Sequence, residues 1–520
     1  MAVTTDQETL KNFLKRRHPE YYTSLPHWTF VESTYQGGRD WFGANIFRYI
    51  KEGEKEFNDR LGRAYRFNHT RETVDLVQKY IFKSDVERSN DAPKEIGDFW
   101  NKATQSGLDI DQFMMLVSCM SAIFGRIWVF TDTNKTQQVV TAADEKEAQV
   151  GVYAYFVKPQ NILDVGFARD GSIAWILVME TRRDDQDPFT ATGNITLEYR
   201  LWTPDAWYLF DIIQAGKRGE VVRMLDSGIN ELGEVPCFPV DHVLGENRYT
   251  APGLIDDSAY LDRAVANYLS NLDAIIQDQT FSQLAMPAQG MLPGEDKYNA
   301  LLEMGTKRIF VYDGEGGAKP EYISPDPSQA QLIITVINKI IAEIYNTVGM
   351  AGERTKEDNA VGIDNSSGVA KAYDFERVNS LLANKADSLE NAENRLVEMV
   401  MKWHGKAAPA EELVKYPDTF DVRSLFDEFT IAQNLSLVDA PKTVRREQML
   451  QVVDKLFPRL AADLRKTIET ELKSWPADPV DLAAAASSKP PTSFNASNKN
   501  PQTQNRQGQV TSETANKQVA

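Results

Sequence analysis

The sequence has few of the features that mark secreted, disulfide-rich or membrane-spanning proteins. Its 520 residues include two cysteines, Cys119 and Cys237, which cannot build a disulfide framework and favour a reducing cytoplasm. Both lie in apolar surroundings, which is typical of inert core thiols. No apolar run reaches the roughly 18 residues of a membrane span, and the first residues lack the basic and apolar regions of a signal peptide. We therefore expect a soluble protein with no membrane partner.

Basic charge is also scarce, because 57 Lys and Arg face 75 Asp and Glu, which gives a net charge of −18. A protein that grips DNA neutralises phosphates with a basic face. The composition therefore argues against a repressor, a nuclease or a DNA-packing coat. It still allows contact with moving DNA, since an acidic channel repels phosphates and keeps a duplex from sticking. On charge alone, plain solubility is the favoured explanation.

Motifs for metal binding and catalysis are missing. The five histidines have no metal-like spacing: His18, His27, His69, His242 and His404. No nucleotide-binding P-loop or nucleophile elbow occurs, and the run Gly314–Lys319 fits a hairpin turn between two predicted strands. Pairs such as Asp184-Asp185 are more typical of turns and caps than of an acid/base dyad. We expect no metal, no cofactor and no enzymatic activity, although a hydrolase with an unrecognised carboxylate pair stays open.

The chain is organised around two helices that bracket a compact middle. The first helix follows Asp256-Asp257-Ser258 and runs from Ala259 to about Phe281, with one apolar stripe at three- and four-residue spacing. The second runs over Gln331–Tyr345 with Gly349 as its stop signal. Because the second helix is apolar on more than one side, we expect neighbours to bury several of its faces.

The middle contains one predicted short helix, Glu295–Met304, and two predicted strands, Arg308–Tyr312 and Lys319–Ile323. A small α/β unit held between two long helices needs a surface to pack against. One chain offers little there, whereas a ring of copies would supply it.

Helices are predicted in the first 125 residues and strands after them. Residues 1–60 are expected to be helical and polar, interrupted by an aromatic-rich loop, Tyr21–Trp41, with a Gly37-Gly38 turn. Further helices are predicted within Glu52–Tyr65, from near Arg71, and as a pair over residues 95–125. The later strands have no helices between them, which predicts an antiparallel sheet: Arg126–Thr131, Val152–Val157, Ile173–Glu180, Ile195–Trp202 and Ala206–Phe210. Val235–Pro239 is expected to be a crossing to the first long helix.

A helix of about ten turns is predicted over Ala370–His404. Apolar residues recur along it every seven residues, and Lys385 interrupts the seam: Phe375, Leu382, Leu389, Leu396 and Trp403, with Val378, Ala392 and Met399 between them. An amphipathic helix docked on its own domain is favoured over a coiled coil. Further helices are predicted beyond it: Arg423–Asn434, Lys442–Leu456 and Arg459–Leu472. Residues 476–520 cannot bury a core and should be disordered.

This order of elements resembles the portal proteins of tailed bacteriophages, in which two stem helices bracket a clip. Phrases within Trp28–Phe82 are also similar to the amino-terminal wing of one portal subgroup. The resemblance implies an α+β, portal-like fold with the following parts: wing, 1–250, β-rich over 125–246; stem helices, 251–283 and 326–350; clip, 284–325; tunnel loop, 351–369; long tunnel or wing helix, 370–404; helical crown, 405–475; disordered tail, 476–520.

The resemblance also implies a function. A portal is a homo-oligomeric ring, usually a dodecamer, that is assembled in the host cytoplasm and located at one vertex of the virion capsid. Its implied partners are the large terminase, a head–tail adaptor, capsid and scaffolding proteins, and double-stranded DNA bound transiently and without sequence specificity. Arg354, Lys356 and Lys371 are the candidates for transient contact with phosphates in the DNA channel, although the residues by themselves favour an ordinary solvated loop. The clip would dock partners through these residues: Glu295, Lys297, Arg308, Tyr312 and Glu315. A different virion adaptor, in the tail or baseplate, is the alternative.

Overall fold

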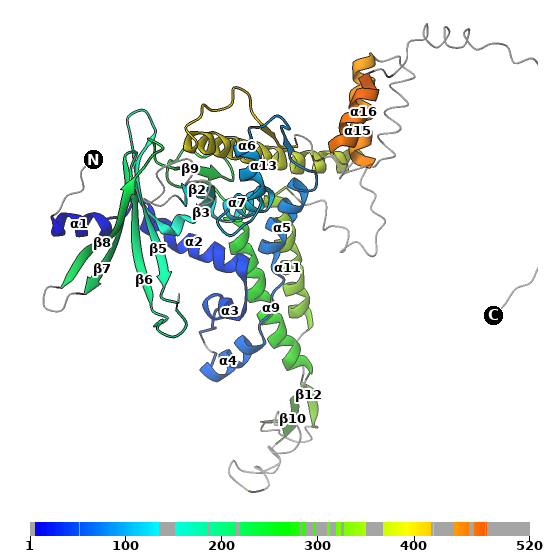
Figure 1. The fold of residues 1–520 in the computed structure, drawn as a ribbon. Helices are drawn as coiled ribbons and strands as arrows, with labels where there is room; N and C mark the ends of the chain where they lie inside the picture. Colours follow the sequence, from blue (N-terminus) through cyan, green and yellow to red (C-terminus); the bar gives the residue numbers. More distant parts are fainter. Residues whose placement is uncertain are drawn as a thin grey trace, which may run out of the picture. The chain divides into compact units, whose positions relative to one another are not determined.

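The computed structural model describes residues 6–50, 52–134, 151–185, 187–214, 219–280, 283–287, 296, 309–312, 319–323, 327–349, 368–417, 420, 441–456, 462–473 and 475. The chain divides into two compact units, residues 1–422 and 423–520, and each is described by itself. The fold is α+β, as predicted, with helices and mainly antiparallel sheets (Figure 1). None of the described helices is long and apolar enough to cross a membrane.

Helices form the amino-terminal part of the first unit: α1 Gln7–Lys15, α2 Tyr21–Gln36, α3 Arg39–Asn45, α4 Glu54–Arg63, α5 His69–Ile81, α6 Lys94–Asn101 and α7 Ile110–Phe124. Local signals set their ends. Asn68 accepts a hydrogen bond from the Arg71 amide at the start of α5, and Asp109 accepts one from the Gln112 amide at the start of α7. The helix starting near Arg71 and the helical pair over residues 95–125 are confirmed.

The prediction of a loop over Tyr21–Trp41 was wrong, because α2 occupies most of it. Pro26 and the aromatic content argue against a helix locally, but Tyr21, Trp28 and Val31 lie on one side and are buried in the main core. Burying such large side chains outweighs the cost of the proline. Gly37, with φ of 68°, ends the helix as expected.

The predicted strands are present, but they belong to two sheets rather than one. The first sheet has the order β3-β2-β9 and is antiparallel, with β2 Arg126–Thr133, β3 Val152–Val157 and β9 Cys237–Asp241. The central strand, β2, is buried along Arg126–Thr131. The segment Val235–Pro239, predicted as a crossing, contributes most of β9. Pro239 is tolerated because β9 is an edge strand.

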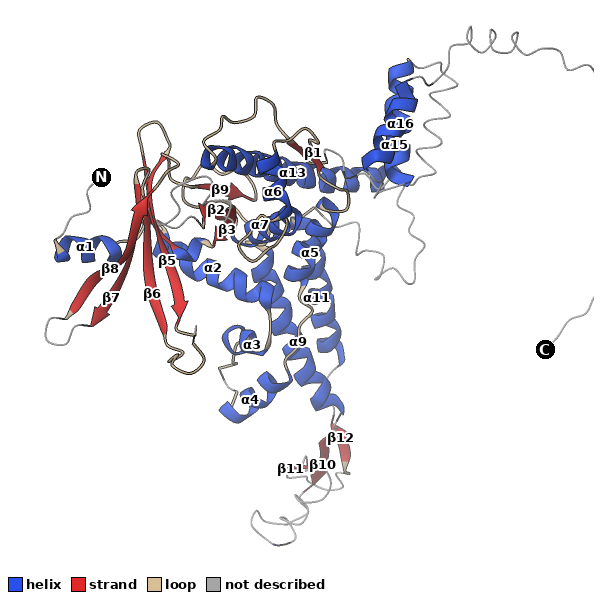
Figure 2. Cartoon of the chain, viewed as in Figure 1, coloured by secondary structure: helices blue, strands red, loops and turns tan. Residues whose placement is uncertain are grey.

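The second sheet is an antiparallel meander in the order β4-β5-β6-β7-β8 (Figure 2). Its strands are β4 Ile162–Phe167, β5 Ile173–Arg183, β6 Ile195–Trp202, β7 Ala206–Gln214 and β8 Glu220–Ile229, and β4 follows the short 3₁₀ helix Pro159–Asn161. Strands β4 and β8 were not predicted. Each carries a glycine under a tryptophan of the neighbouring strand: a Cβ on Gly166 would lie 2.3 Å from the Trp175 ring, and one on Gly228 would lie 2.6 Å from the Trp207 ring. Such glycines weaken the strand pattern in the sequence.

The two long helices are confirmed as α9 Ser258–Thr280 and α11 Pro327–Thr347. They pack side by side around Val265, Leu269, Leu272, Ile337 and Ile344. At 1.5 Å per residue each helix is roughly 30–35 Å long. The end of α9 and the start of α11 both join the small sheet, so this sheet lies at the tip of the antiparallel pair (Figure 1).

The small sheet has the order β11-β10-β12, with β10 Gln283–Pro287, β11 Ile309–Tyr312 and β12 Glu321–Ile323. The expectation of a hairpin between the last two strands was wrong. The unpredicted β10 lies between them, parallel to β11 and antiparallel to β12. The predicted short helix Glu295–Met304 lies outside the described residues except for Asp296, which is helical.

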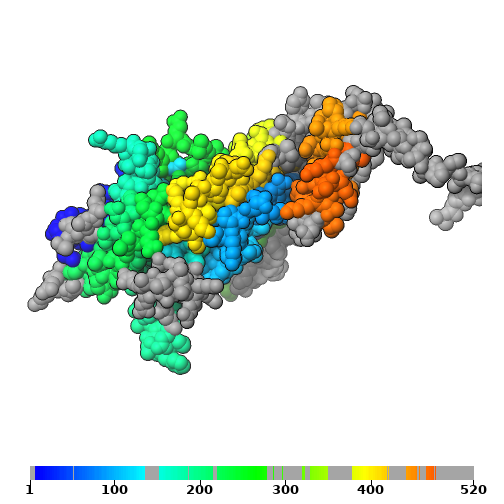
Figure 3. All heavy atoms as spheres, turned by 45° about the horizontal axis from the view of Figure 1, so that its top comes forward, coloured from blue at the N-terminus to red at the C-terminus, as the bar shows by residue number. Residues whose placement is uncertain are grey.

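The long helix is α13, Gly368–Trp403, and it packs on its own domain as predicted. Leu382, Leu389 and Leu396 of the seven-residue repeat are buried in the main core. In Figure 3 the surface of α13 and the segment after it (yellow) lies beside the surface of the N-terminal helices (blue), in agreement with the contacts between α13 and α6. A two-stranded ladder, β1 Glu87–Arg88 with β13 Val414–Lys415, joins the same regions.

In the second unit the structure describes two helices, α15 Lys442–Leu456 and α16 Ala462–Lys473, close to the predicted bounds. They contact each other. The predicted helix Arg423–Asn434 and the predicted disordered tail, 476–520, lie outside the described residues.

Candidate functional site at the base of the helix pair

Most of the predicted site residues lie outside the described part of the chain. This holds for the channel residues Arg354 and Lys356, and for the following residues of the predicted clip: Glu295, Lys297, Arg308 and Glu315. Lys371 lies in the first turns of α13, but its side chain is not described. Tyr312 is the last residue of β11, opposite Pro287 of β10. These residues therefore stay predictions, and the site that the structure builds lies elsewhere.

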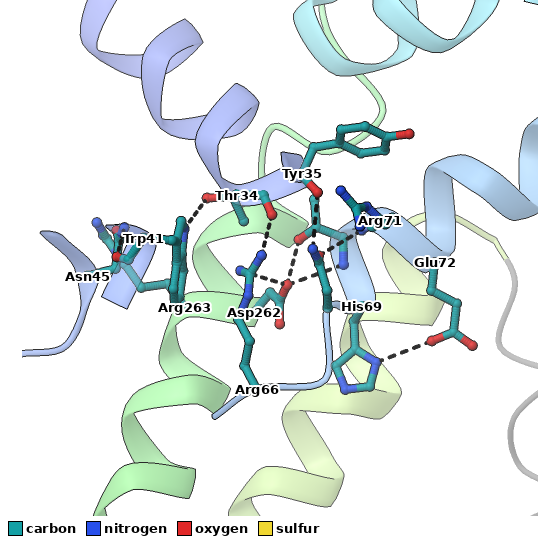
Figure 4. A network of polar contacts seen from close by, with 12 residues as sticks. Thr34, Tyr35, Trp41, Asn45, Arg66, His69, Arg71, Glu72, Asp262 and Arg263 are labelled. Atoms are coloured by element: carbon teal, nitrogen blue, oxygen red, sulfur yellow. Dashed lines mark hydrogen bonds and ion pairs between the residues drawn. The ribbon is translucent and has the colours of Figure 1, made fainter. Parts of the chain in front are cut away.

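A buried polar network holds α9 against the amino-terminal helices α2, α3 and α5, which belong to the part of the first unit that we call the body: its helices and two larger sheets without α9, α11 and the small sheet (Figure 4). Asp262 of α9 is fully buried, and its Oδ2 accepts a hydrogen bond from the Thr70 hydroxyl at 2.8 Å. The same oxygen lies 3.4 Å from Nη1 of Arg66, whose side chain is 4% exposed. Arg66 also donates to the carbonyl of Thr34, and its guanidinium lies 3.9 Å from the Trp41 ring centroid. One carboxylate of α9 thus connects α2, α3 and the start of α5.

A second set of polar contacts holds α11 against the start of α5. The hydroxyl of Tyr345 donates to Oε2 of Glu72 at 2.6 Å and lies 3.2 Å from Nδ1 of the fully buried His69. His69 and Glu72 are on the first turns of α5. The start of α5 therefore contacts both long helices through different side chains.

The segment from α3 to α4 forms hydrogen bonds with side chains of α9. Arg60, 3% exposed, donates to Ser270 at 2.8 Å and pairs with Glu52 at 2.8 Å. The pairing with Arg60 holds the pKa of Glu52 below its ordinary value. The amide of Phe47 donates to Asn267 at 2.9 Å. These contacts extend the attachment of α9 beyond its first turns.

A buried lysine lies where α13 meets α7. Lys385 is 1% exposed, and its ammonium donates to the hydroxyl of Ser121. Burial lowers its pKa to about 7, although Asp241 and Cys119 nearby favour the charged form. Asp241 is itself bonded by Arg126 at 2.6 and 2.7 Å. Lys385 is the residue that interrupts the apolar seam in the sequence, and the structure places it inside the body.

An open cavity of about 770 Å³ lies between the two larger sheets, and it bears on the enzyme alternative. Its lining includes Asp132, Tyr153, Glu180 and Arg200. Burial raises the pKa of Asp132, which is a property of some catalytic acids. Glu180 is held by Arg200 through two bonds of 2.6 and 3.2 Å, as in a structural ion pair across neighbouring strands.

No group of His, Cys, Asp and Glu that could hold a metal ion occurs among the described residues. Of the acidic pairs singled out in the sequence, Asp184 accepts bonds from the Thr192 amide and hydroxyl in a turn. Asp256 accepts bonds from the Gly253 amide at 2.8 Å and faces His27 at 2.9 Å. Asp184 is thus a turn residue, as predicted, whereas Asp256 accepts a local hydrogen bond and also contacts α2 through His27.

The network at the base of the helix pair was missed because its members are far apart in the sequence. Neither Asp262 nor Arg66 belongs to a recognisable sequence motif. The signal that could have indicated the network was the single charge of Asp262 inside the apolar stripe of α9. Asp262 follows Leu261 on a helix whose stripe continues at Val265 and Leu269. What the arrangement does is mechanical, since charged and polar side chains hold both long helices in one orientation on the body.

Comparisons with known proteins found no matching family model and no matching curated protein. Solved structures that are similar to this chain include three chains of gene transfer agent particles. A chain from the neck of an empty gene transfer agent particle, computed with C6 symmetry, has 9% identity and a TM-score of 0.38, over 77% of this chain and 97% of that one. A chain from the native gene transfer agent virion has 8% identity and a TM-score of 0.37, over 76% and 92%.

The third chain is from the neck of the native gene transfer agent particle, computed with C12 symmetry. It has 8% identity and a TM-score of 0.36, over 74% of this chain and 89% of that one. Identities of 8–9% with TM-scores below 0.4 do not assign a family or a function.

Proposed function

We propose that this chain is a portal protein, which assembles into a ring at one vertex of a virion capsid and forms a conduit for DNA. The observation that carries the proposal is the helix pair: α9 and α11 hold a small separate sheet at their tip. Among the described residues, the strands of this sheet pair with one another and with no strand of the two larger sheets. A protruding unit of this kind is suited to contacts with other molecules.

The polar network supports the same proposal. A protruding pair of helices needs a firm base if neighbouring copies are to align, and the paired charges at Asp262 and Arg66 fix one orientation. Buried polar groups of this kind specify geometry more than they add stability. The body supplies the rigid part, and the pair supplies the contact surface.

The acidic composition fits a conduit. A net charge of −18 on each copy would give a ring a strongly negative field, which repels phosphates and lets a duplex slide. Arg354, Lys356 and Lys371 remain the proposed channel residues. The terminase, a head–tail adaptor, and capsid and scaffolding proteins remain the proposed partners, with the small sheet and its connections as the docking unit.

Mass measurement of the purified full-length chain tests the proposal. Twelve copies of the 58.6 kDa chain would have a mass of about 700 kDa, which light scattering distinguishes from a monomer. Electron microscopy should show closed rings with a central hole. A chain that stays monomeric across the concentrations at which virion proteins assemble would contradict the proposal.

The cavity between the sheets supports one alternative, a hydrolase that uses Asp132 and Glu180. In that case a monomer would be the active form, and Asp132→Asn would abolish hydrolysis while leaving the mass unchanged. We favour the portal proposal because Glu180 is already held by Arg200 at 2.6 Å and is not free to act as a partner base.

A further inference from the structure

Three buried basic side chains share one carboxylate where α13 meets α7 and the end of β9. Arg126, His242 and Lys385 are 5%, 3% and 1% exposed. The carboxylate is Asp241, and Arg126 already bonds both of its oxygens, at 2.6 and 2.7 Å. Among the described residues, no carboxylate other than Asp241 acts on Lys385 or His242. The Nδ1 atom of His242 is buried and has no hydrogen-bond partner in the described part of the chain.

The groups beyond Lys385 add no net charge to this cluster. On α7, the thiol of Cys119 is close enough for the Lys385 charge to act on it, and burial raises its pKa, so it stays neutral. Asp75 and Arg71 of α5 also act on Cys119, and their charges have opposite signs. Asp75 accepts a hydrogen bond from the hydroxyl of Tyr35 on α2 at 3.0 Å. A proton taken up by the cluster therefore stays unbalanced.

The cluster holds such protons weakly. Burial lowers the pKa of Lys385 to about 7 and that of His242 well below its ordinary value of 6.5, and the charge of Lys385 lowers the pKa of His242 further. Both groups bind protons more tightly when α13 is away from α7 than when it is packed on it. The packed arrangement therefore loses stability through Lys385 as pH falls from 10.5 to about 7, and through His242 below 6.5.

The middle of α13, residues 378–392, is held differently from the turns that follow. It packs at the surface of the body, with Asp387 exposed on its outer side, and it contacts α7 through the bond from Lys385 to Ser121. Figure 2 shows α13 beside α7 and β9, in agreement with its contacts to both. The following turns have a separate attachment, since Arg88 bonds the buried Glu393 at 2.6 Å. Loss of the first contact leaves the second in place.

We propose that the contact of α13 with α7 and β9 is a pH-sensitive switch, in which proton uptake by Lys385 and His242 loosens the middle of α13. The bond between Glu393 and Arg88 keeps the following turns attached. Because the hydroxyl of Ser388 donates to the carbonyl of Asp241 at 2.6 Å, the same movement releases the helix from the end of β9. The switch is a property of the body and does not depend on the proposed function.

Hydrogen exchange followed by mass spectrometry tests the switch in the full-length protein. Exchange is measured at pH 9, 7 and 6 and divided by the chemical exchange rate at each pH, so that the ratio reports opening. The middle of α13 should open on the order of 100-fold more often at pH 6 than at pH 9. At pH 6 it should also exchange faster than strand β5, whose residues Ile176–Val178 are buried in the other sheet. Faster exchange than β5 shows that the opening is local.

Substitutions divide the pH profile between the two groups. Lys385→Met should remove the rise in opening between pH 9 and pH 7, and His242→Phe should remove the smaller rise below pH 6.5. Lys385→Arg carries its charge at every pH and should open at pH 9 about as often as wild type does at pH 6. The matched controls, Lys94→Met and His404→Gln, are at exposed positions and should leave the profile unchanged.

Two results would overturn the switch. One is a wild-type protein in which the middle of α13 and β5 exchange at the same rate at pH 6, because protons would then act on the whole fold. The other is a rise in opening that persists in both Lys385→Met and His242→Phe. The wild-type comparison needs no substitution, so it decides the question even if a variant does not fold.

Discussion

At the residue scale, the decisive feature is a buried carboxylate on α9. Asp262 lies beside Arg66 and Thr70, and its charge is balanced by Arg66 at 3.4 Å. A buried pair of this kind adds little net stability compared with an apolar pair, but breaking it leaves the remaining charge buried without a counter-ion. A substitution that removes the carboxylate therefore destabilises the fold by leaving the Arg66 guanidinium buried without a counter-ion.

We expect Asp262→Asn to lower the free energy of unfolding by about 3–5 kcal/mol, since it removes the counter-charge of Arg66. Asp273→Asn is the matched control on the same helix. Asp273 pairs with Arg63 at 3.2 Å near the surface, so its loss should cost less than about 1 kcal/mol. Urea unfolding followed by circular dichroism measures both. Equal effects of the two variants would show that the Asp262 pair does not hold α9.

Lys385 gives a prediction that depends on pH. Its pKa is about 7 in the folded protein, below the ordinary value of 10.5, so between these values the unfolded chain binds the additional proton. Stability therefore rises with pH through this window and loses that contribution as pH falls from about 10.5 to about 7. From pH 7 to pH 9 this group should raise the free energy of unfolding by about 2 kcal/mol.

Lys385→Met removes this pH-dependent contribution and should be more stable than wild type at pH 7, by an amount that shrinks at pH 9. Lys94→Met, at an exposed position of α6, is the control and should change neither value by more than about 0.5 kcal/mol. Unfolding midpoints at the two pH values measure the effect. A Lys385→Met variant whose stability changes with pH as the wild type's does would show that another group accounts for the slope.

At the element scale, α13 shows how the same pattern fits two structures. Its seven-residue repeat is compatible with a coiled coil between copies or with docking on its own domain. The structure shows docking: Leu382, Leu389 and Leu396 are in the main core. Buried charge pairs add specificity, since Glu393 is fully buried and Arg88 bonds it at 2.6 Å. Burial raises the pKa of Glu393, and Arg88 partly offsets the rise.

Leu389→Ala should therefore lower the free energy of unfolding of the isolated subunit by about 2–5 kcal/mol, through lost burial and the cavity it leaves. Asp387→Ala, two residues away on the exposed side of α13, should change it by less than about 0.5 kcal/mol. Chemical unfolding at low protein concentration makes the comparison. If the destabilisation by Leu389→Ala appeared only in assembled rings, the repeat would serve contacts between copies.

At the scale of the whole molecule, the small sheet is a separate unit carried by the helix pair. Its strands pair only with one another among the described residues, in the order β11-β10-β12. The ends of α9 and α11 lie next to each other where the sheet begins, since the helices pack along their lengths. Removing the sheet should therefore leave the body intact.

We expect replacement of residues 283–323 by a short Gly/Ser linker to leave the unfolding free energy of the body within about 1 kcal/mol of wild type, because loop-closure cost depends weakly on loop length. Hydrogen exchange of α9 and α11 away from the new linker should be unchanged. Loss of folding in this variant would show that the sheet is part of the core, which would contradict a protruding docking unit.

The sequence by itself determined the elements whose signal is local. The stripe on α9, the stop at Gly349, the long apolar repeat of α13 and the aromatic strands from Arg126 to Trp202 are all patterns of neighbouring residues. The predicted bounds of these elements agree closely with the structure. The net charge likewise follows from the composition, and the lack of catalytic motifs follows from short patterns in the sequence.

Only the tertiary structure decided which elements meet. Helix α2 forms where the local sequence suggested a loop, because its aromatic side chains find a core on other elements. Strand β10 separates two strands that are nearer to each other in sequence, and the larger strands divide into two sheets. Lys385 and Asp262 are buried by partners far along the chain. The physical reason is the same in each case: packing and charge pairing act between residues that are close in space, whatever their separation in sequence.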